Sequence, residues 1–285
     1  MNLSYYPGCT LKTKAKNFED SAIASMAALG VTLIELPRWN CCGTVYSLAE
    51  DDLVHHIAPV RTLIRVKERG ENKVATLCSF CYNTLERANL MMRDSEEKRN
   101  TLNSFMTEEI DYDGSVEVVH LLSVLRDDLG WEAVAAKIER PLNDLKLAPY
   151  YGCTLLRPQE AAIDDVERPT ILQELIRATG ATAVDFPLAT ECCGSYQAVN
   201  QKDVVRERIY QIIGSLGKRG AEAVMVSCPL CFFNMESFQK RIMETDPGFR
   251  EIPVFYFTEL LAHAMGMEGA LRPADTGKVR RRAAG

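Results

Sequence analysis

The chain has 285 residues, of which 47% are hydrophobic and 25% charged, and its formal net charge is −6. This composition is that of a globular protein with one large or two medium domains, and the acidic balance argues against nucleic acid as a partner, because phosphate binding requires a basic face. The sequence has no apolar run long enough for a membrane span and no signal-like N-terminus, so we expect a cytoplasmic protein without a membrane span.

Short apolar or β-branched runs alternate with amphipathic stretches along the whole chain. In the first half we predict strands and helices, in chain order, at 3–6, 18–29 (helix), 31–36, 53–69 (helix), 73–78 and 116–121. In the second half we predict them at 147–151, 170–179 (helix), 182–187, 204–218 (helix), 223–228, 232–244 (helix) and 253–257. Such alternation requires right-handed crossovers and a mostly parallel sheet. We therefore expect an α/β fold with two small domains, 1–141 and 142–268, and a disordered tail at 269–285 that carries a basic cluster.

The ten cysteines occur in the same order in both halves, and none is left over. Each half has a lone cysteine, a Cys-Cys-Gly triplet and a Cys-x-x-Cys motif. The first set is Cys9, Cys41, Cys42, Cys78 and Cys81, and the second set is Cys153, Cys192, Cys193, Cys228 and Cys231. The triplet and the last motif are 36 residues apart in the first half and 35 in the second. Because the cytosol keeps thiols reduced, this duplicated pattern indicates metal binding or redox chemistry rather than disulfides.

Each cysteine group follows a predicted strand, so parallel strands bring the groups to the sheet edge where ligands bind in open α/β folds. Each Cys-x-x-Cys motif also opens a predicted helix, whose N-terminus stabilises thiolates and anionic clusters. Pro229 suits the first position of such a helix. Glycines stand at matching places in the two halves, where they let the backbone approach a bulky cofactor closely: Gly8, Gly43, Gly152 and Gly194.

The number of thiols restricts the kind of metal site. A structural zinc ion takes four ligands, and a cubane [4Fe–4S] cluster likewise takes four thiolates, whereas each half offers five. Either one cysteine per site stays free for chemistry, or the cluster is not a simple cubane. Two stabilising zinc sites remain an alternative, although zinc explains the Cys-x-x-Cys motifs and not the fifth thiol.

The doubled pattern of lone cysteine, CCG and CxxC resembles the CCG-domain family, and over about 265 residues the chain is similar to the B subunits of heterodisulfide reductases. In that family each domain holds a non-cubane [4Fe–4S] cluster through the five cysteines of its motif. The resemblance therefore implies two such clusters. One would be held by Cys9, Cys41, Cys42, Cys78 and Cys81, and the other by Cys153, Cys192, Cys193, Cys228 and Cys231.

The resemblance also implies an activity and partners. The expected function is that of the catalytic iron–sulfur subunit of a heterodisulfide reductase-type complex, which reduces a disulfide, CoM-S-S-CoB or an analogue, by one-electron steps at the two clusters. The implied partners in that complex are a ferredoxin-like subunit together with a flavin-containing subunit. The alternatives are an electron-relay subunit of a bacterial redox complex and a zinc-stapled assembly subunit.

The four histidines are further candidate site residues. His55 and His56 are neighbours on a helical pattern and point in different directions, so we expect a solvated face rather than a shared metal. His120 and His263 flank the fourth strand of each half without aligning with each other. For these two we expect packing or a hydrogen-bonded core position, with proton donation as the lesser alternative.

Basic residues follow the lone cysteine of each half: Lys12, Lys14, Lys16 and Arg157. They would suit contact with an anionic substrate. Solvation on a helix surface explains them equally well from sequence, and both interpretations stay open at this point.

Overall fold

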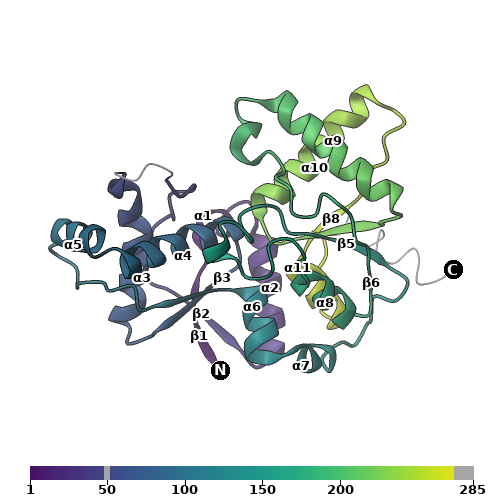
Figure 1. Ribbon diagram of the computed structural model, residues 1–285. Coiled ribbons are helices and arrows are strands. Elements are labelled where there is room, and N and C mark those ends of the chain that lie inside the picture. The colour runs from purple at the N-terminus through teal and green to yellow at the C-terminus, as the bar shows by residue number, and fades with distance from the viewer. Residues whose placement is uncertain (48–51, 273–285) are drawn as a thin grey trace.

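The computed structural model describes residues 1–47 and 52–272 and has two parallel four-stranded sheets, one in each half, flanked by helices (Figure 1). The first sheet has the strand order β2-β1-β3-β4 and the second the order β6-β5-β7-β8, so the two halves share one topology. The strands are β1 (Asn2–Tyr6), β2 (Thr32–Glu35), β3 (Lys73–Thr76), β4 (Glu117–His120), β5 (Lys146–Tyr150), β6 (Thr182–Ala183), β7 (Ala223–Val226) and β8 (Val254–Tyr256). The predicted α/β fold with two parallel sheets is confirmed.

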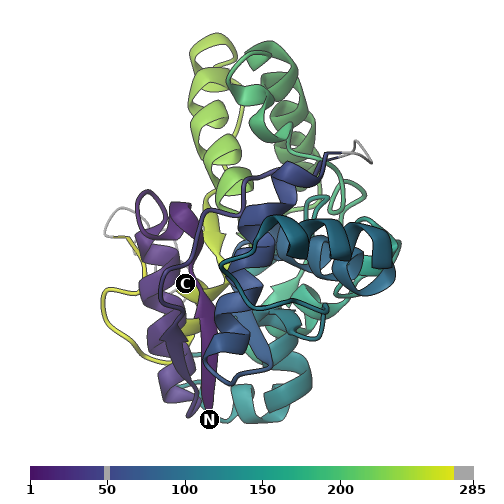
Figure 2. The ribbon, with the colours of Figure 1, turned by 90° about the vertical axis from the view of Figure 1, so that its left-hand side faces the viewer.

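Helices connect the strands in both halves. Those of the first half are α1 (Gly8–Leu11), α2 (Lys16–Ala28), the 3-10 turn η1 (Leu53–His56), α3 (Ile57–Glu68), α4 (Ser79–Asp94), α5 (Glu96–Phe105), α6 (Leu121–Ser123), the π-helical η2 (Val124–Leu129) and α7 (Trp131–Ala135). Those of the second half are η3 (Gln159–Ala161), α8 (Ile171–Ala178), η4 (Ser195–Ala198), α9 (Lys202–Lys218), α10 (Pro229–Thr245) and α11 (Phe257–Ala264). Helices α9 and α10 lie side by side and extend away from the rest of the molecule (Figures 1 and 2).

One predicted strand is shorter than expected. The stretch 182–187 pairs as β6 over Thr182–Ala183 alone, and the Val184 N–H adds one more hydrogen bond, to the Leu147 carbonyl at 2.8 Å. Pro187 lies in the remainder and has no N–H to donate to a sheet. The chain therefore leaves the sheet early and begins the loop that carries the second cysteine doublet.

The last helices of each half pack against the other half. Helix α11 lies on α2, where the rings of Phe18 and Tyr256 stack with centroids 4.2 Å apart. In the reciprocal contact, α7 lies on α8, and Trp131 Nε1 donates to the Glu174 carboxylate at 2.8 Å. Buried side chains of both halves accordingly form one continuous hydrophobic core. This exchange fixes the two sheets relative to each other.

The chain passes from one half to the other near the predicted boundary at 141/142, a division that stays a prediction. Just before it, the backbone N–H groups of Glu139 and Arg140 both donate to the Ala264 carbonyl, at 3.0 and 2.8 Å. Beyond the predicted end of the second domain at 268, Leu271 is buried and Arg272 lies over the ring of Phe232, so the chain stays against the body through 272. Most of the predicted tail, 273–285, lies outside the described residues.

A search of the described helices for membrane spans found none with the length and apolar character that crossing a bilayer requires.

Candidate functional site

The carboxyl edges of the two sheets meet at the centre of the molecule. Cys78 and Cys228 are the N-caps of α4 and α10, and the neighbouring Cys228 thiol lowers the pKa of Cys78 well below its ordinary value. Directly after and before them, Ser79 Oγ and Ser227 Oγ are 2.8 Å apart, and all four side chains are buried. The two Cys-x-x-Cys motifs thus face each other across a pseudo-twofold axis, with each helix N-terminus directed at the thiols as the sequence predicts.

The thiols of the first motif form contacts in pairs. Cys9 Sγ lies 3.6 Å from Cys41 Sγ, and Cys42 Sγ lies 3.7 Å from Cys81 Sγ. The neighbouring thiols of Cys41 and Cys81 lower the pKa of Cys42 to about 2. Cys9 and Cys41 are exposed, whereas the other members of the motif are buried. The first motif therefore combines buried thiols, one of them with a strongly lowered pKa, with two thiols that solvent reaches.

The second motif is more enclosed, and its lowered pKa falls on the first member of the doublet, Cys192, whereas in the first motif it falls on the second member, Cys42. The neighbouring thiols of Cys153 and Cys193 lower the pKa of Cys192 to about 2. Buried Asn234 adds a donor, with its Nδ2 3.4 Å from Cys193 Sγ. Cys153 and Cys192 are partly buried, in contrast to the exposed cysteines at the same places in the first motif.

The glycines that the sequence singles out allow this convergence. All four have a positive φ: Gly8, Gly43, Gly152 and Gly194. A Cβ at Gly8 would lie 2.8 Å from Cys81 Sγ, and a Cβ at Gly152 would lie 3.2 Å from Cys231 Sγ. Any other residue at these two places would therefore push against a thiol.

The donor set suits an iron–sulfur group. Six buried thiols and four more exposed ones come from two matching motifs, helix N-termini begin at Cys78 and Cys228, and glycines keep the backbone close. Within the described ranges, no three side chains of His, Cys, Asp or Glu converge as the ligands of one metal ion; the thiols lie in pairs instead.

Two tyrosines that sequence analysis missed support the cysteine loops. The hydroxyl of Tyr6 donates to the Asn40 carbonyl at 2.8 Å, and that of Tyr150 donates to the Glu191 carbonyl at 2.6 Å. In each case the acceptor residue directly precedes the cysteine doublet. Burial, followed by the nearby thiols, raises the pKa of both tyrosines, which keeps them protonated as donors. A tyrosine three residues before the lone cysteine in each half was the available signal.

A cavity of about 260 Å³ opens on one side of the thiol centre, between the two halves. Its walls include Asn83 and Arg87 of α4, Tyr46 of the loop after the first doublet, and Cys153 and Arg157 of the second half. It is therefore lined by a candidate cluster ligand and by two guanidinium groups.

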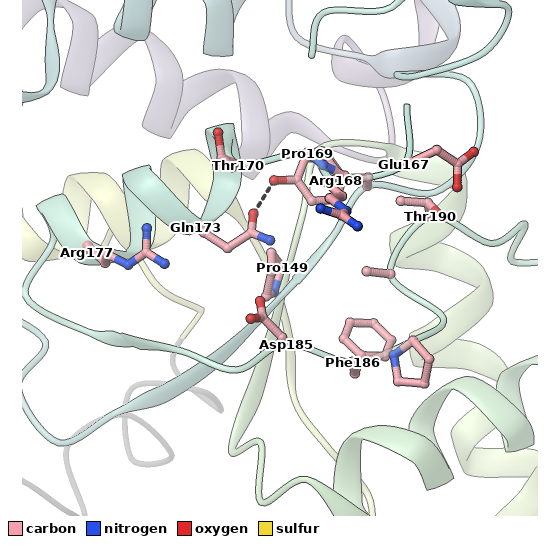
Figure 3. A pocket seen from close by; sticks show the side chains of 13 residues that line it. Pro149, Glu167, Arg168, Pro169, Thr170, Gln173, Arg177, Asp185, Phe186 and Thr190 are labelled. Carbon is pink, nitrogen blue, oxygen red and sulfur yellow. Dashed lines mark hydrogen bonds between the residues drawn. The ribbon is translucent and has the colours of Figure 1, made fainter. Parts of the chain in front are cut away.

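A second cavity, of about 400 Å³, lies wholly in the second half and has no cysteine in its wall (Figure 3). Arg168, Arg177 and Asp185 line it, and Tyr151 donates a hydrogen bond to Gln173 inside it. It is separate from the thiol centre.

The CCG cysteine-rich domain model matches residues 3–86 and 147–236, which is more than half of the chain. The chain belongs to the CCG-domain family. Both matched stretches contain the full five-cysteine motif of their half, and each covers the first three strands of its sheet together with the thiol loops.

Several relatives match nearly the whole chain. The 8-methylmenaquinol:fumarate reductase membrane anchor subunit of Wolinella succinogenes is 29% identical over 93% of this chain and 92% of its own length. The B subunit of the ferredoxin/F(420)H(2)-dependent CoB-CoM heterodisulfide reductase of Methanosarcina acetivorans is 29% identical over 93% and 89%. A protein of Archaeoglobus profundus named as similar to the B subunit of heterodisulfide reductase is 27% identical over 92% and 89%.

Among solved structures, a hypothetical protein from Helicobacter pylori superposes with a TM-score of 0.71 at 14% identity. The match covers 93% of this chain and 49% of that one, so this chain spans about half the length of that structure. At this identity the likeness concerns the fold alone.

For the two neighbouring histidines of the first CCG repeat, the structure differs from the expectation at one of them. His55 is solvent-exposed as expected and its Nδ1 lies 2.6 Å from the Asp52 carboxylate, but His56 is only 3% exposed and packs on Tyr46 with ring centroids 4.5 Å apart. The prediction of a solvated face was therefore wrong for His56. Both residues lie in the 3-10 turn η1, where successive side chains are about 120° apart, so one faces water and its neighbour faces inward.

His120 is the hydrogen-bonded core histidine that the sequence favours. It is fully buried, its Nε2 donates to the Leu77 carbonyl at 2.8 Å, and its Nδ1 accepts from the Leu122 N–H at 3.2 Å. Burial lowers its pKa to about 4. Leu77 precedes the first Cys-x-x-Cys motif, so His120 supports the turn that carries Cys78. His263 lies on α11, half-buried.

The basic residues after the lone cysteines separate into two groups. Lys12 Nζ lies 2.6 Å from the buried Glu19 carboxylate, Lys16 pairs within its own helix, and Lys14 is exposed on the surface. Arg157 instead lines the cavity beside the thiol centre. The interpretation as surface solvation thus fits the lysines of the first CCG repeat, and contact with a ligand remains for the arginine of the second.

Proposed function

We propose that this chain is the iron–sulfur subunit of a heterodisulfide reductase-type complex and that it reduces a disulfide at two non-cubane [4Fe–4S] clusters. The observation that carries the proposal is the pair of five-thiol motifs that face each other at one buried centre. Relatives named as B subunits of heterodisulfide reductases, or as similar to them, match over 92–93% of the chain and support it.

Each half would hold one cluster through its own five thiols: Cys9, Cys41, Cys42, Cys78 and Cys81 in the first, and Cys153, Cys192, Cys193, Cys228 and Cys231 in the second. When bound, the two clusters would supply single electrons to a reaction that consumes two electrons and two protons and converts one disulfide into two thiols. The protein positions the ligands through the helix N-termini and through Tyr6 and Tyr150, and it keeps water from the central pair Cys78 and Cys228 by burying both.

The electrons would come from partner proteins of the complex. All ten cysteines of the sequence belong to the two motifs, so we propose that a separate ferredoxin-like subunit delivers the electrons. A flavin-containing subunit would precede it in the electron-transfer chain. The exposed thiols Cys9 and Cys41 would place the first cluster within reach of such a donor.

Anaerobic purification followed by metal and sulfide analysis tests the cofactor. We expect about eight iron atoms per chain, four for each motif, and paramagnetic signals that change when a thiol is added. Stoichiometric zinc with little iron after anaerobic reconstitution would instead support the zinc-stapled assembly subunit.

An electron relay is the second candidate function. The observation that favours it is the relative from Wolinella succinogenes, whose name places it in a fumarate reductase. The two candidates differ at the substrate: a disulfide reductase releases thiols from a disulfide when supplied with a low-potential electron donor, whereas a relay protein becomes reduced and releases none.

A further inference from the structure

The cavity of the second half lies where its sheet stops pairing (Figure 3). In the first sheet, β1 and β2 pair as far as Tyr5 and Glu35, and the Leu36 N–H then donates to the Tyr5 carbonyl at 2.8 Å. When the lone cysteines of the two halves are aligned, Pro149 takes the position of Tyr5. A proline has no N–H to donate to the neighbouring strand, and β6 ends after two residues. The cavity of about 400 Å³ lies at this gap, with Pro149 in its wall.

The same difference between the halves leaves one carboxylate without a cation. Counted from the start of β6, Asp185 occupies the position that Glu35 occupies in β2. In the first half, Lys12 Nζ lies 2.6 Å from the Glu35 carboxylate. In the alignment of the lone cysteines, Leu156 takes the position of Lys12 and carries no charge. Within the described ranges Asp185 forms no ion pair, so the second half keeps the carboxylate and lacks the ammonium that neutralises its counterpart.

Two guanidinium groups and an amide line the cavity together with this carboxylate. In the part of the chain that the structure describes, the side chains of Arg168 and Arg177 are exposed and form no hydrogen bond or ion pair. The Gln173 carbonyl oxygen accepts from the Tyr151 hydroxyl, which leaves the Gln173 Nε2 donors for a ligand. In the view of Figure 3, Gln173 and Asp185 lie between the two guanidinium groups. Each guanidinium offers five N–H donors in a fixed geometry.

The charges in the cavity require a ligand of mixed charge. Glu167 is the remaining charged residue of the wall; it is exposed, and Figure 3 shows its carboxylate directed away from the other side chains. The charged groups that face the cavity are therefore two guanidiniums and the carboxylate of Asp185. A simple anion such as phosphate would meet this carboxylate as a like charge. The complement of all three groups is a compound with two acid groups and one ammonium group.

We propose that this cavity binds an acidic amino acid, with its ammonium group on Asp185 and its two carboxylates on Arg168 and Arg177. The ammonium group of the ligand supplies the charge that a lysine supplies in the first half. A planar guanidinium binds a carboxylate through two parallel hydrogen bonds, which are among the stronger ones in proteins. The site contains no cysteine and binds its ligand whether or not the thiol motifs hold iron, so the inference is independent of the proposed function.

Calorimetric titration of the anaerobically purified, full-length protein with L-glutamate and with glutarate tests the site. Glutarate has the same two carboxylates and lacks the ammonium group. We expect L-glutamate to bind at least about tenfold more tightly than glutarate, because only L-glutamate pairs with Asp185. Asp185→Asn should remove this preference. Arg177→Leu should instead weaken the binding of both compounds, because each loses a partner for one carboxylate.

Asp203→Asn is the matched control, because Asp203 is 99% exposed in α9, lies outside the cavity and should leave the preference unchanged. Melting temperatures measured without ligand show that each variant is folded. Failure of the unaltered protein to bind L-glutamate overturns the inference, as does equal binding of the two compounds. A preference that survives in Asp185→Asn, or that disappears in Asp203→Asn as well, also overturns it.

Discussion

His120 couples a single buried ring to the position of a candidate cluster ligand, Cys78. Its pKa is lowered by burial from the ordinary 6.5 to about 4, so the folded state favours the neutral ring. The stability that this provides is present above the unfolded pKa and is lost as the pH falls toward the folded one. Between pH 7 and pH 5 we expect the free energy of unfolding to fall by about 2 kcal/mol more in the native protein than in His120→Gln, in which the amide can still donate to Leu77. Melting temperatures measured across this range check it, and parallel curves for the two proteins would contradict it.

The paired thiols lead to a prediction about iron content. Cys42 and Cys193 are buried members of the doublets, and each contacts the last cysteine of its own motif. Cys42→Ser should lower the iron content by about half and leave the second motif loaded, and Cys193→Ser should do the reverse. Each variant is the control for the other in metal analysis of the anaerobically purified protein. Full iron content in either one would rule out the five-ligand assignment for that half.

At the scale of elements, the contact between α2 and α11 holds the two halves together. Phe18 is fully buried, stacked on Tyr256 and in edge contact with Phe257, two residues of the second half. Phe18→Ala should lower the free energy of unfolding by about 3–5 kcal/mol, because it leaves a cavity between the halves. Phe105→Ala, at a side chain that is 67% exposed, should change it by less than about 0.5 kcal/mol. Thermal unfolding followed by circular dichroism measures both, and similar effects of the two substitutions would show that this interface contributes little.

The alternation of strands and helices could be read from the sequence because apolar periodicity and the position of turns are local properties. The location of the thiols followed from it, since parallel strands bring the cysteine groups to one edge. The pairing of α2 with α11 could not be predicted, because periodicity marks an apolar face without saying which distant helix covers it. The same reason explains His56, whose burial depends on a 3-10 turn and on the ring of Tyr46. The cavity beside Cys153 was missed because its walls come from both halves.

At the scale of the whole molecule, the two halves bring two equivalent cysteine motifs face to face, but the two motifs differ in how far solvent reaches their thiols. The first motif exposes Cys9 and Cys41, whereas the second keeps Cys153 and Cys192 partly buried beside a cationic cavity. Under the proposed function, this difference suits entry of electrons at the first, more exposed motif. Reduction of a disulfide consumes two electrons, while an iron–sulfur cluster normally passes one, so both motifs should be needed for each turnover.

This requirement gives a test of the complete assembly. Cys9→Ser and Cys153→Ser should each abolish thiol release from a disulfide when the protein is supplied with a low-potential electron donor, because each removes a ligand of one motif. In both variants, the intact motif should still take up electrons, which paramagnetic resonance can detect. Such uptake would show that the chain is folded. The variant at Cys153 decides between the two functions, since this thiol lines the cavity that opens between the two halves. If Cys153→Ser loses the iron of its motif and still releases thiols at the native rate, one motif suffices for turnover, and the second serves to relay electrons instead of meeting the substrate.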